Sequence, residues 1–508
     1  SPACSSSSSM NTKTFSYILI ASFALSACAP QNGPTREELK ANTSVFIDED
    51  DAVRPSVQIS TEDGLVDGKS EYSDIDLPED EEMFAREEQT LLEQGEMTAV
   101  TTKKGKPAKK KRAPGIDRSK ITVGSSSGGG ELANNTATSF PPASIAKLIT
   151  SGVALEKLGT EFRFTNSMVY RPVADRPGVV TDFRWVSDGD PTLGHSHFEP
   201  GQVAKFAVGL KAKGIKKIIG PIVLQPNDPR FAGGIAPPGT PDWELGLCYG
   251  APARDFNMNN NCVGGGSLSR AALGKDQVKA ALKKILEDQL KANGIVLEPN
   301  GKATGGAFVA TPFQSAKIDR IIYHMNKPSD NLLANSLFRA VAMTDADKTS
   351  GPFEVAAKVY KQTVTGWMNT VKAPQLAPEL AFLDGAGLSP LSKSTPRSFL
   401  QVLKYLAQAP YFKTIWESLP VGGVDGTLKA RYKNPLVKGK VRAKTGTMGG
   451  HYQLAGYLPR YGADGKSVKE LVPFVILTST PVSDAYQSGT RSYQEEIVTN
   501  LMRKINQR

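Results

Sequence analysis

A helix that begins directly after two prolines places the strongest constraint on how this chain can fold. Pro141 and Pro142 cannot lie in a helix interior, because proline lacks an N–H and clashes with the preceding turn. Beyond them, apolar residues recur at the spacing of one helical face, and Gly159 follows as a stop: Ile145, Leu148, Ile149, Leu155 and Leu158. The sequence therefore predicts a buried helix that opens at Ser144.

Ser144 and Lys147 stand three residues apart at the start of this helix. The spacing puts both side chains on one side of the helix, with Cβ atoms about 5–6 Å apart. Free N–H groups at a helix N-terminus favour a developing oxyanion and lower the pKa of a lysine one turn further on. An isolated Ser-x-x-Lys pattern is usually an ordinary buried helix, so the hypothesis that Ser144 is a nucleophile depends on motifs elsewhere.

Two further motifs follow in the chain. Ser329-Asp330-Asn331 is the only Ser-Asp-Asn, and Lys444-Thr445-Gly446-Thr447 contains the only Lys-Thr-Gly, late in a predicted strand. Ser-x-x-Lys, Ser-Asp-Asn and Lys-Thr-Gly in this order are the known signature of class A β-lactamases and penicillin-binding proteins. The three motifs together predict an acylation site.

The predicted catalytic residues are Ser144, Lys147, Ser329, Asn331 and Lys444. Lys147, kept neutral by nearby positive charge and burial, takes the proton of Ser144 as that residue attacks a carbonyl. Ser329 passes the proton towards the leaving amine, and Lys444 tunes the acidity of Ser329. Asn331 bonds either the substrate amide or Lys147.

The Lys-Thr-Gly strand is the predicted substrate-binding element. An extended peptide can pair with its edge, and Lys444 with Thr445 can receive a substrate carboxylate. Gly446 is expected to let the substrate approach closely. The backbone N–H groups of Ser144 and Thr447 are the expected oxyanion hole.

Beyond these motifs, residues 120–508 resemble the D-alanyl-D-alanine carboxypeptidase/endopeptidase family of the penicillin-binding protein 4 type. The matching phrases are Pro142-Ala143-Ser144 to Lys147, Glu161-Phe162-Arg163-Phe164, Gly189-Asp190-Pro191-Thr192-Leu193, His324 with Ser329-Asp330-Asn331, Asp384-Gly385-Ala386-Gly387-Leu388-Ser389, Val424-Asp425-Gly426-Thr427-Leu428 and Arg442-Ala443-Lys444-Thr445-Gly446-Thr447. For Asp384 to Ser389 we expect a structural loop.

The resemblance implies an α/β (α+β) fold. A β-lactamase/transpeptidase-like domain, with an antiparallel sheet flanked by helices, is expected at residues 120–165 and 306–508, interrupted by an inserted mixed-β domain at 166–305. Ser329 follows Ser144 at a sequence separation of 185, whereas a β-lactamase has a much shorter interval. The chain also lacks a Glu-x-x-Leu-Asn after the second motif, and Glu379 does not fit it. The stretch before Ser144 departs from the family pattern, because it is short for the usual pair of strands.

Periodicity predicts the elements of these domains. Helices are expected at Asp276–Ala292, Ile318–Met325, Asn331–Ala342, Pro352–Asn369, Pro396–Leu406 and Ser492–Ile505. Strands are expected at Ile121–Val123, Ser167–Val173, Phe183–Val186, Ile218–Leu224, Gly439–Thr445, Tyr452–Leu458 and Val472–Ser479.

The N-terminal segment predicts export. Lys13 precedes an apolar run, Phe15–Leu25, of about eleven residues, which is too short to span a membrane. Residues 1–29 are therefore predicted to be a signal peptide. Leu25 to Cys28 resembles a bacterial lipobox, so Cys28 is the expected lipidation site. Ordinary cleavage after Ala29 is the competing interpretation.

Charge is distributed unevenly along the chain. Residues 31–100 carry a net charge of −15, residues 101–120 carry +8 and residues 121–508 carry +16. Residues 30–119 show no apolar period, so we predict a disordered tether, acidic and then basic. Behind a signal peptide, the basic parts favour a membrane surface or an anionic wall polymer over nucleic acid.

Cysteines and histidines leave alternatives open. Cys248 and Cys262 form a disulfide if the protein is exported, and are unrelated thiols in a reducing compartment. His195 and His197 are either half of a metal site or exposed loop histidines. We expect neither a metal nor a cofactor in the reaction.

The resulting hypothesis is a periplasmic, lipid-anchored serine DD-peptidase. It would hydrolyse D-Ala-D-Ala ends or D-Ala cross-links of peptidoglycan peptide stems through an acyl-Ser144 intermediate, with β-lactams as covalent inhibitors. The alternatives are a slow β-lactamase or esterase, and a non-catalytic wall-binding lipoprotein.

Overall fold

The computed structural model describes residues 34–46, 53–56, 133–134, 136–231, 236–262, 271–465 and 467–506. The predicted signal peptide with Cys28, most of the predicted tether and the predicted strand Ile121–Val123 lie outside the described residues. Within these ranges, no helix has both the length and the apolar character needed to cross a membrane.

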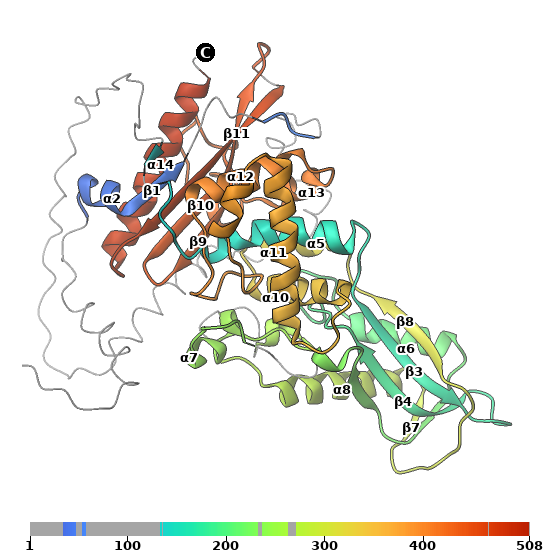
Figure 1. The fold of residues 1–508 in the computed structure, drawn as a ribbon. Coiled ribbons are helices and arrows are strands. Elements are labelled where there is room, and N and C mark those ends of the chain that lie inside the picture. Colours follow the sequence, from blue (N-terminus) through green and yellow to red (C-terminus); the bar gives the residue numbers. More distant parts are fainter. Residues whose placement is uncertain are drawn as a thin grey trace, which may run out of the picture.

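A five-stranded antiparallel sheet in the order β2-β1-β11-β10-β9 supports the part of the chain that carries the three motifs (Figure 1). Its strands are β1 (Thr43–Phe46), β2 (Ala133–Asn134), β9 (Arg442–Met448), β10 (His451–Tyr461) and β11 (Val468–Ser479). Side chains alternate between the faces of a strand. On β11, Val475 and Leu477 enter one hydrophobic cluster, while Phe474 and Ile476 enter another. The sheet is therefore buried on both faces.

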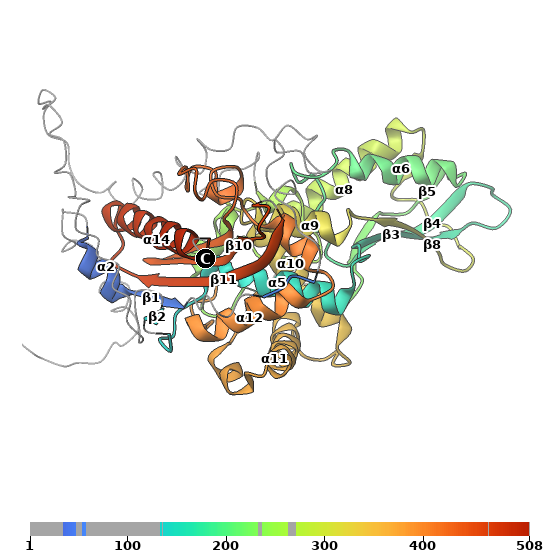
Figure 2. The same cartoon turned by 90° about the horizontal axis from the view of Figure 1, so that it is seen from above.

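Helices cover both faces of this sheet. α14 (Asp484–Ile505) packs on one face through Ile497, Val498 and Leu501, and a group of helices packs on the other (Figure 2). That group comprises α5 (Ala146–Leu158), α9 (Ile318–Asn326), α10 (Asn331–Val341), α11 (Pro352–Thr370), α12 (Pro396–Gln408) and α13 (Phe412–Ser418), with the short 3-10 helices Ala342–Thr344 and Pro374–Glu379. Leu428 of the 3-10 helix Gly426–Leu428 belongs to the cluster beneath α14. α5 is central in this layer, since Leu148, Ile149 and Val153 are fully buried.

The fold class predicted from the sequence is confirmed, and most of the predicted helices agree with the structure to within two residues at each end. The last helix begins eight residues earlier than predicted, at Asp484, because the Ser483 hydroxyl accepts a hydrogen bond from the N–H of Tyr486 (3.3 Å) and caps it. β9 begins at Arg442 rather than at Gly439, which adopts a positive φ of 75° in the preceding turn.

The prediction of a disordered tether over residues 30–119 is wrong for residues 34–46 and 53–56. Helix α2 (Arg36–Asn42) begins with a capping box, in which the Thr35 hydroxyl accepts from the N–H of Glu38 (3.1 Å) and the Glu38 carboxylate accepts from the N–H of Thr35 (2.8 Å). Leu39 and Val45 are buried in the cluster beneath α14. Two apolar side chains are too few to produce a hydrophobic period in this acidic sequence. In the folded chain, both pack into the core and help to hold the segment on the protein.

Strand β1 also accounts for the short stretch before Ser144. It pairs with β11 in antiparallel register, with Val45 opposite Ile476. The outer strands on this side of the sheet are therefore supplied from inside the predicted tether and by β2, rather than by the residues just before the helix.

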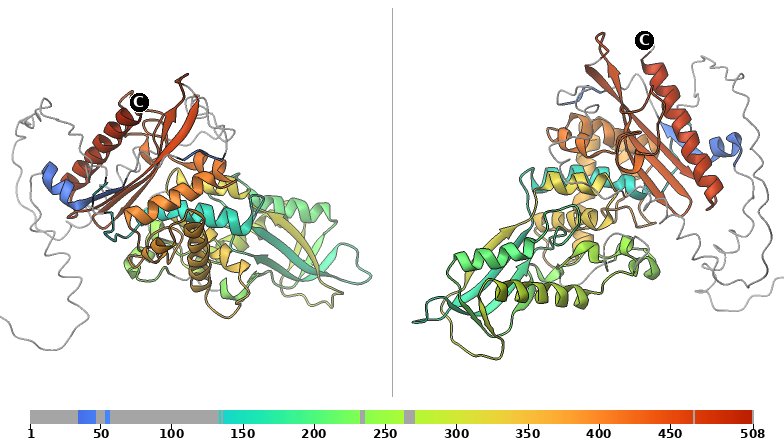
Figure 3. Two further views of the ribbon diagram at one scale, coloured as in Figure 1. Left: turned by 45° about the horizontal axis from the view of Figure 1, so that its top comes forward. Right: turned by 180° about the vertical axis from the view of Figure 1, so that it is seen from behind.

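A second, mixed six-stranded sheet lies beside the helical layer (Figure 3). Its strands are β3 (Thr165–Pro172), β4 (Val179–Ser187), β5 (Lys217–Ile219), β6 (Val223–Pro226), β7 (Val296–Glu298) and β8 (Val309–Gln314). Helices α6 (Gln202–Ala212) and α8 (Lys275–Ala292) pack on it around Trp185 and Phe206, and the remaining helical turns are Pro229–Phe231, α7 (Asp242–Leu245), Cys248–Gly250 and Asn259–Asn261. β8 pairs with β3, so this sheet continues past the predicted boundary at residue 305. We call residues 165–314 the insert.

Replacing Leu39 tests whether the N-terminal segment belongs to the folded protein. Leu39→Ala removes a side chain that is 5% exposed, and we expect it to lower the free energy of unfolding by about 2 kcal/mol. Urea unfolding and limited proteolysis will measure the effect. Glu37→Gln, at an exposed position of the same helix, is the control, and equal stability of the two variants would contradict the assignment.

Candidate active site

The three motifs converge at the junction of the helical layer, the five-stranded sheet and the insert. Ser144 lies in a 3-10 turn, Ala143–Ile145, that leads directly into α5. The Lys147 Nζ atom lies 2.9 Å from Ser144 Oγ and 2.7 Å from Asn331 Oδ1. The Lys444 Nζ atom donates to Ser329 Oγ at 2.8 Å. All five predicted catalytic residues are thus linked in two hydrogen-bonded groups.

The groups around the Lys147 amine determine where its lone pair points. The side chain is fully buried, and its third neighbour is the carbonyl oxygen of Ala386, at 3.0 Å. Asn331 Oδ1 and the Ala386 oxygen can only accept hydrogen bonds. A neutral amine has two N–H groups and one lone pair, so these two acceptors occupy both N–H groups. The lone pair then faces the hydroxyl of Ser144.

Burial lowers the pKa of Lys147 to about 7, although the negative charges of Asp384 and Asp330 oppose this shift. Burial, one of the two predicted causes of a neutral Lys147, therefore dominates, and the two carboxylates act against it. Burial, followed by the positive charge of Lys147, also holds the pKa of Lys444 well below its usual value.

The Asp384–Ser389 loop supports the nucleophile. The sequence predicted a structural loop here but not this role. The Asp384 carboxylate accepts hydrogen bonds of 2.6 to 3.0 Å from the N–H groups of four following residues. This turn presents the Ala386 carbonyl to Lys147. A side chain at Gly387, where φ is 80°, would place its Cβ 1.9 Å from the Ala143 oxygen, so the loop packs directly against the Ser144 turn.

Backbone strain is concentrated at the site. Ala143 and Ser329 have positive φ values of 46° and 71°, a region that non-glycine residues rarely occupy and that costs about 1–3 kcal/mol at each residue. Each strained residue either precedes or is one of the reactive serines. Packing surrounds Ala143, which is 1% exposed, and the Lys444 amine donates to the hydroxyl of Ser329.

Gly446 has a packing role in addition to the one predicted. A Cβ at this position would lie 3.0 Å from the Ser144 nitrogen and 3.1 Å from the Pro142 oxygen. The missing side chain therefore lets β9 approach the nucleophile turn, and close approach of the substrate stays a prediction. β9 is nevertheless an edge strand, Thr447 on it is exposed, and the Thr445 hydroxyl donates to Thr427 Oγ1 at 2.8 Å.

Beside β9, an ion pair between the buried Lys327 and the partly exposed Asp425 orders the Val424–Leu428 stretch. The Lys327 amine lies 2.5 Å from an Asp425 carboxylate oxygen and donates to the Leu419 carbonyl at 2.8 Å. Burial lowers the pKa of Lys327 to about 8. The Thr427 N–H donates to the Lys327 carbonyl at 3.2 Å, which fixes Thr427 where Thr445 meets it.

The insert contributes to the second motif. Asp330 caps α10 by accepting from the Leu333 N–H (2.9 Å), and its other oxygen contacts His195 Nε2 (3.1 Å) and Asn260 Nδ2 (2.8 Å). These hydrogen bonds outweigh burial and lower the pKa of Asp330 to about 2. Cys248 and Cys262, in the same part of the insert, form a disulfide in the structure.

His195 is buried and His197 is partly buried, so the prediction of exposed loop histidines is wrong. His195 is 3% exposed, and the His197 ring stacks on His324 with centroids 5.0 Å apart. Burial lowers the pKa of His197 to about 4 and that of His324 to about 3, which keeps both rings neutral. Within the described ranges, no three His, Cys, Asp or Glu side chains are grouped as metal ligands.

Known proteins resemble this chain in fold and in sequence. The chain is 27% identical over 401 residues to the D-alanyl-D-alanine carboxypeptidase DacB of Haemophilus influenzae, covering 64% of this chain and 78% of that protein. It is 25% identical over 405 residues to the D-alanyl-D-alanine carboxypeptidase of Actinomadura sp. strain R39, covering 65% and 72%. The crystal structure of penicillin binding protein 4 (dacB) from H. influenzae superimposes with a TM-score of 0.58 at 25% identity, covering 73% of this chain and 93% of that one.

The sequence profile of the D-Ala-D-Ala carboxypeptidase 3 (S13) family matches residues 114–278 and 267–501. These two matches cover the helical layer, the insert and every strand of the five-stranded sheet except β1. The chain therefore belongs to this family and is a serine-type D-Ala-D-Ala carboxypeptidase.

Proposed function

We propose that Ser144 is the nucleophile and Lys147 its general base. The observation that supports this proposal is the direction of the Lys147 lone pair. The amine contacts two carbonyl-type acceptors, which take its N–H groups, and the Ser144 hydroxyl, which faces the lone pair. With its pKa at about 7, the amine is half neutral at physiological pH. It takes the proton of Ser144 as Oγ bonds to the carbonyl carbon of the penultimate D-Ala residue.

Ser329 and Lys444 complete the acylation step. The Ser329 hydroxyl lies 2.8 Å from the Lys444 amine and relays a proton to the leaving D-alanine nitrogen as the peptide bond breaks. The N–H groups of Ser144 and Thr447 stabilise the oxyanion. Water then hydrolyses the acyl-Ser144 ester, which returns the hydroxyl and releases the shortened peptide.

The proposed substrates are peptidoglycan peptide stems. Edge strand β9 has one side on which an extended peptide can pair, with Lys444, Thr445 and Thr447 alongside. A terminal D-Ala-D-Ala bond and a D-Ala cross-link both present a D-Ala carbonyl to Ser144, so we propose carboxypeptidase and/or endopeptidase activity. β-Lactams present a reactive amide in place of the scissile peptide bond and act as covalent inhibitors.

The position of Glu379 supports a peptidase over an efficient β-lactamase. Its carboxylate accepts from Arg397 Nε at 2.9 Å and also bonds the Thr395 hydroxyl. These partners occupy Glu379 at the start of α12, away from Lys147 and Ser144. We therefore propose slow hydrolysis of the penicilloyl ester, so that β-lactams inhibit the enzyme for long periods.

We propose that the protein acts in the periplasm as a lipoprotein attached through Cys28 to a membrane surface. The sequence Leu25-Ser26-Ala27-Cys28 supports this anchor, and the proposed wall substrate requires export. Anionic wall polymer or lipid, rather than nucleic acid, is the proposed partner of the basic residues.

Replacing the nucleophile and the base tests the acylation site. Ser144→Ala is expected to abolish covalent labelling by a fluorescent penicillin, and Lys147→Ala to slow it by about 10²- to 10⁴-fold, because the general base is lost. Release of D-alanine and cleavage of cross-linked muropeptides are measured in parallel. Ser151→Ala, two turns further along α5, is the matched control. Labelling that persists in Ser144→Ala would refute the assignment.

The pH dependence tests the state of Lys147. Only the neutral amine accepts a proton, so a pKa of about 7 predicts that the acylation rate rises with pH through a midpoint near 7 and levels off above it. Below the midpoint the rate falls about tenfold for each pH unit. Stopped-flow labelling with fluorescent penicillin will measure the profile. A rate that decreases as the pH rises through this range would contradict the proposal.

Metabolic labelling tests the anchor. A fatty-acid analogue is expected to label the protein in cells and to be lost in Cys28→Ser, because the thiol at this position is the site of lipidation. Cys4→Ser, which changes the other cysteine of residues 1–29, is the control. Label that survives Cys28→Ser would exclude Cys28 as its site.

A further inference from the structure

A loop of the insert, closed by its own disulfide, runs along the helix that begins with the second motif. We call residues 248–262 the disulfide loop, because Cys248 and Cys262 at its ends are bonded. It meets α10 at three places, through Tyr249, Ala253 and Asn260. The fully buried Arg339 of α10 donates to the Ala253 carbonyl, which ties the middle of the loop to the helix.

One contact acts on Asp330. Asn260 Nδ2 donates to Asp330 Oδ2 at 2.8 Å, and His195 of the insert contacts the same oxygen. Asn260 has a positive φ of 53°, between Asn259 and Asn261 at 47° and 54°. Asparagine tolerates this conformation better than most residues. The strained turn holds the Asn260 amide against the carboxylate that caps α10.

The other contact acts on Asn331. Its side-chain nitrogen donates to the Tyr249 carbonyl at 2.9 Å, and its oxygen faces the Lys147 amine at 2.7 Å. An asparagine amide can present either its oxygen or its nitrogen after a half turn. The Tyr249 carbonyl accepts only, so it holds the nitrogen on its own side. The disulfide loop therefore makes Asn331 present its oxygen, a hydrogen-bond acceptor, to Lys147 rather than its nitrogen, a donor.

We propose that Asn260 and the Cys248–Cys262 disulfide are positioning elements of the active site, which hold Asp330 and Asn331 in the arrangement that acylation of Ser144 requires. Neither touches the reacting atoms, so both act through the second motif. Cleavage of the disulfide frees the segment that carries Tyr249 and Asn260, and acylation slows while the protein stays folded. The inference rests on the proposed roles of Ser144 and Lys147.

A purely structural disulfide would behave differently. Closing a loop over a sequence separation of 14 stabilises a folded domain, by the loop-closure model, chiefly through the unfolded state. Loss of that effect would lower the melting temperature and leave the chemistry of the folded fraction unchanged. A positioning role changes the rate per folded molecule and its pH profile.

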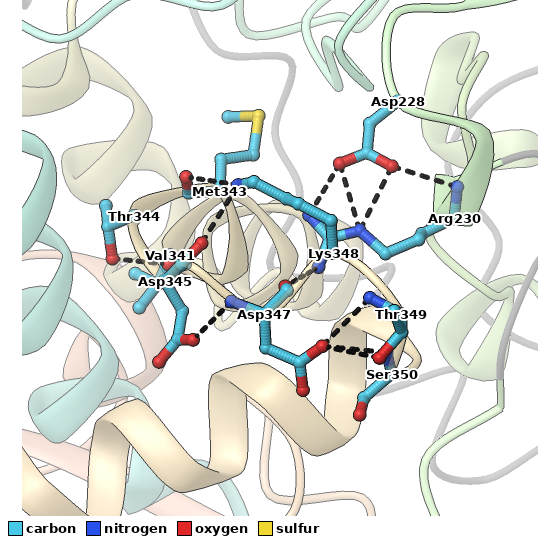
Figure 4. A network of polar contacts seen from close by, with 10 residues as sticks. All are labelled: Asp228, Arg230, Val341, Met343, Thr344, Asp345, Asp347, Lys348, Thr349 and Ser350. Atoms are coloured by element: carbon cyan, nitrogen blue, oxygen red, sulfur yellow. Dashed lines mark hydrogen bonds and ion pairs between the residues drawn. The ribbon is translucent and has the colours of Figure 1, made fainter.

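Asn260→Gly in the full-length protein is the decisive variant, since glycine keeps the positive φ and removes only the amide. Asn259→Gly is the matched control. It makes the same change at the neighbouring left-handed residue, whose amide donates to the Cys262 carbonyl (3.4 Å) and not to the second motif. A second control, Arg230→Gln, breaks another contact between the insert and the helical layer, the hydrogen bond from Arg230 to the Asp347 carbonyl at 2.9 Å (Figure 4).

We expect Asn260→Gly to slow labelling by fluorescent penicillin about tenfold, the factor typical of a lost hydrogen bond to a charged group. The midpoint of the pH–rate profile should move to lower pH. Asp330 and the Asn331 oxygen both favour the charged form of Lys147. Because both are less well placed in the variant, the pKa of Lys147 falls and the midpoint falls with it. Asn259→Gly and Arg230→Gln should retain the rate and the midpoint of the unchanged protein.

The disulfide is tested without mutation by adding a dithiol reagent to the folded protein. The reagent transfers two electrons and two protons, becomes a cyclic disulfide and leaves two thiols on the protein. Labelling should slow about tenfold while circular dichroism stays constant, and the unreactive double variant Cys248→Ser/Cys262→Ser should match the reduced protein. Asn260→Gly provides an independent test if the double variant fails to fold.

An unchanged rate in both Asn260→Gly and the reduced protein would overturn the proposal, as would a slower rate with an unmoved midpoint. Ser144→Ala separates this failure from failure of the proposed function. If Ser144→Ala loses its label while Asn260→Gly labels normally, the assignment of Ser144 as nucleophile is supported and the positioning role of Asn260 is refuted. If Ser144→Ala keeps its label, the proposed function itself is wrong.

Discussion

The burial of the Lys147 amine sets the electrostatics on which the rest of the site depends. Removing this amine from water lowers its pKa to about 7, although two carboxylates oppose the shift. An amine so buried needs a partner for each of its hydrogens, and Asn331 and Ala386 supply them. The strained Ala143 turn, the Asp384–Ser389 loop and the close approach of β9 at Gly446 all hold Ser144 against the remaining lone pair.

The insert is part of this arrangement as well as an attached domain. Its six-stranded sheet has its own core, but His195, Tyr249 and Asn260 extend from it to the second motif. Those contacts determine how Asp330 and Asn331 are oriented, and through them which groups face Lys147. The long interval between the first two motifs thus carries groups that organise the site.

Electrostatic compensation also explains the buried charges behind the sheet. Lys327 lies beside Asp425, and together they fix Thr427 against Thr445 on β9. Removing one partner of such a pair would leave an uncompensated buried charge. The Asp384–Ser389 and Val424–Leu428 stretches, which lie outside the three motifs, therefore belong to the support of the site.

The sequence by itself determined the order of the motifs, the helix that opens at Ser144, the later helices and strands and the mixed character of the insert, because each rests on local spacing or on short-range periodicity. Tertiary structure decided what depends on distant contacts. These are the N-terminal strand that pairs with β11, the burial of His195, the Ala386 carbonyl on Lys147 and the loop behind Asn331. A short strand in an acidic segment has too few apolar residues to show a period, and a backbone carbonyl leaves no trace in residue identity, so only the folded chain reveals either.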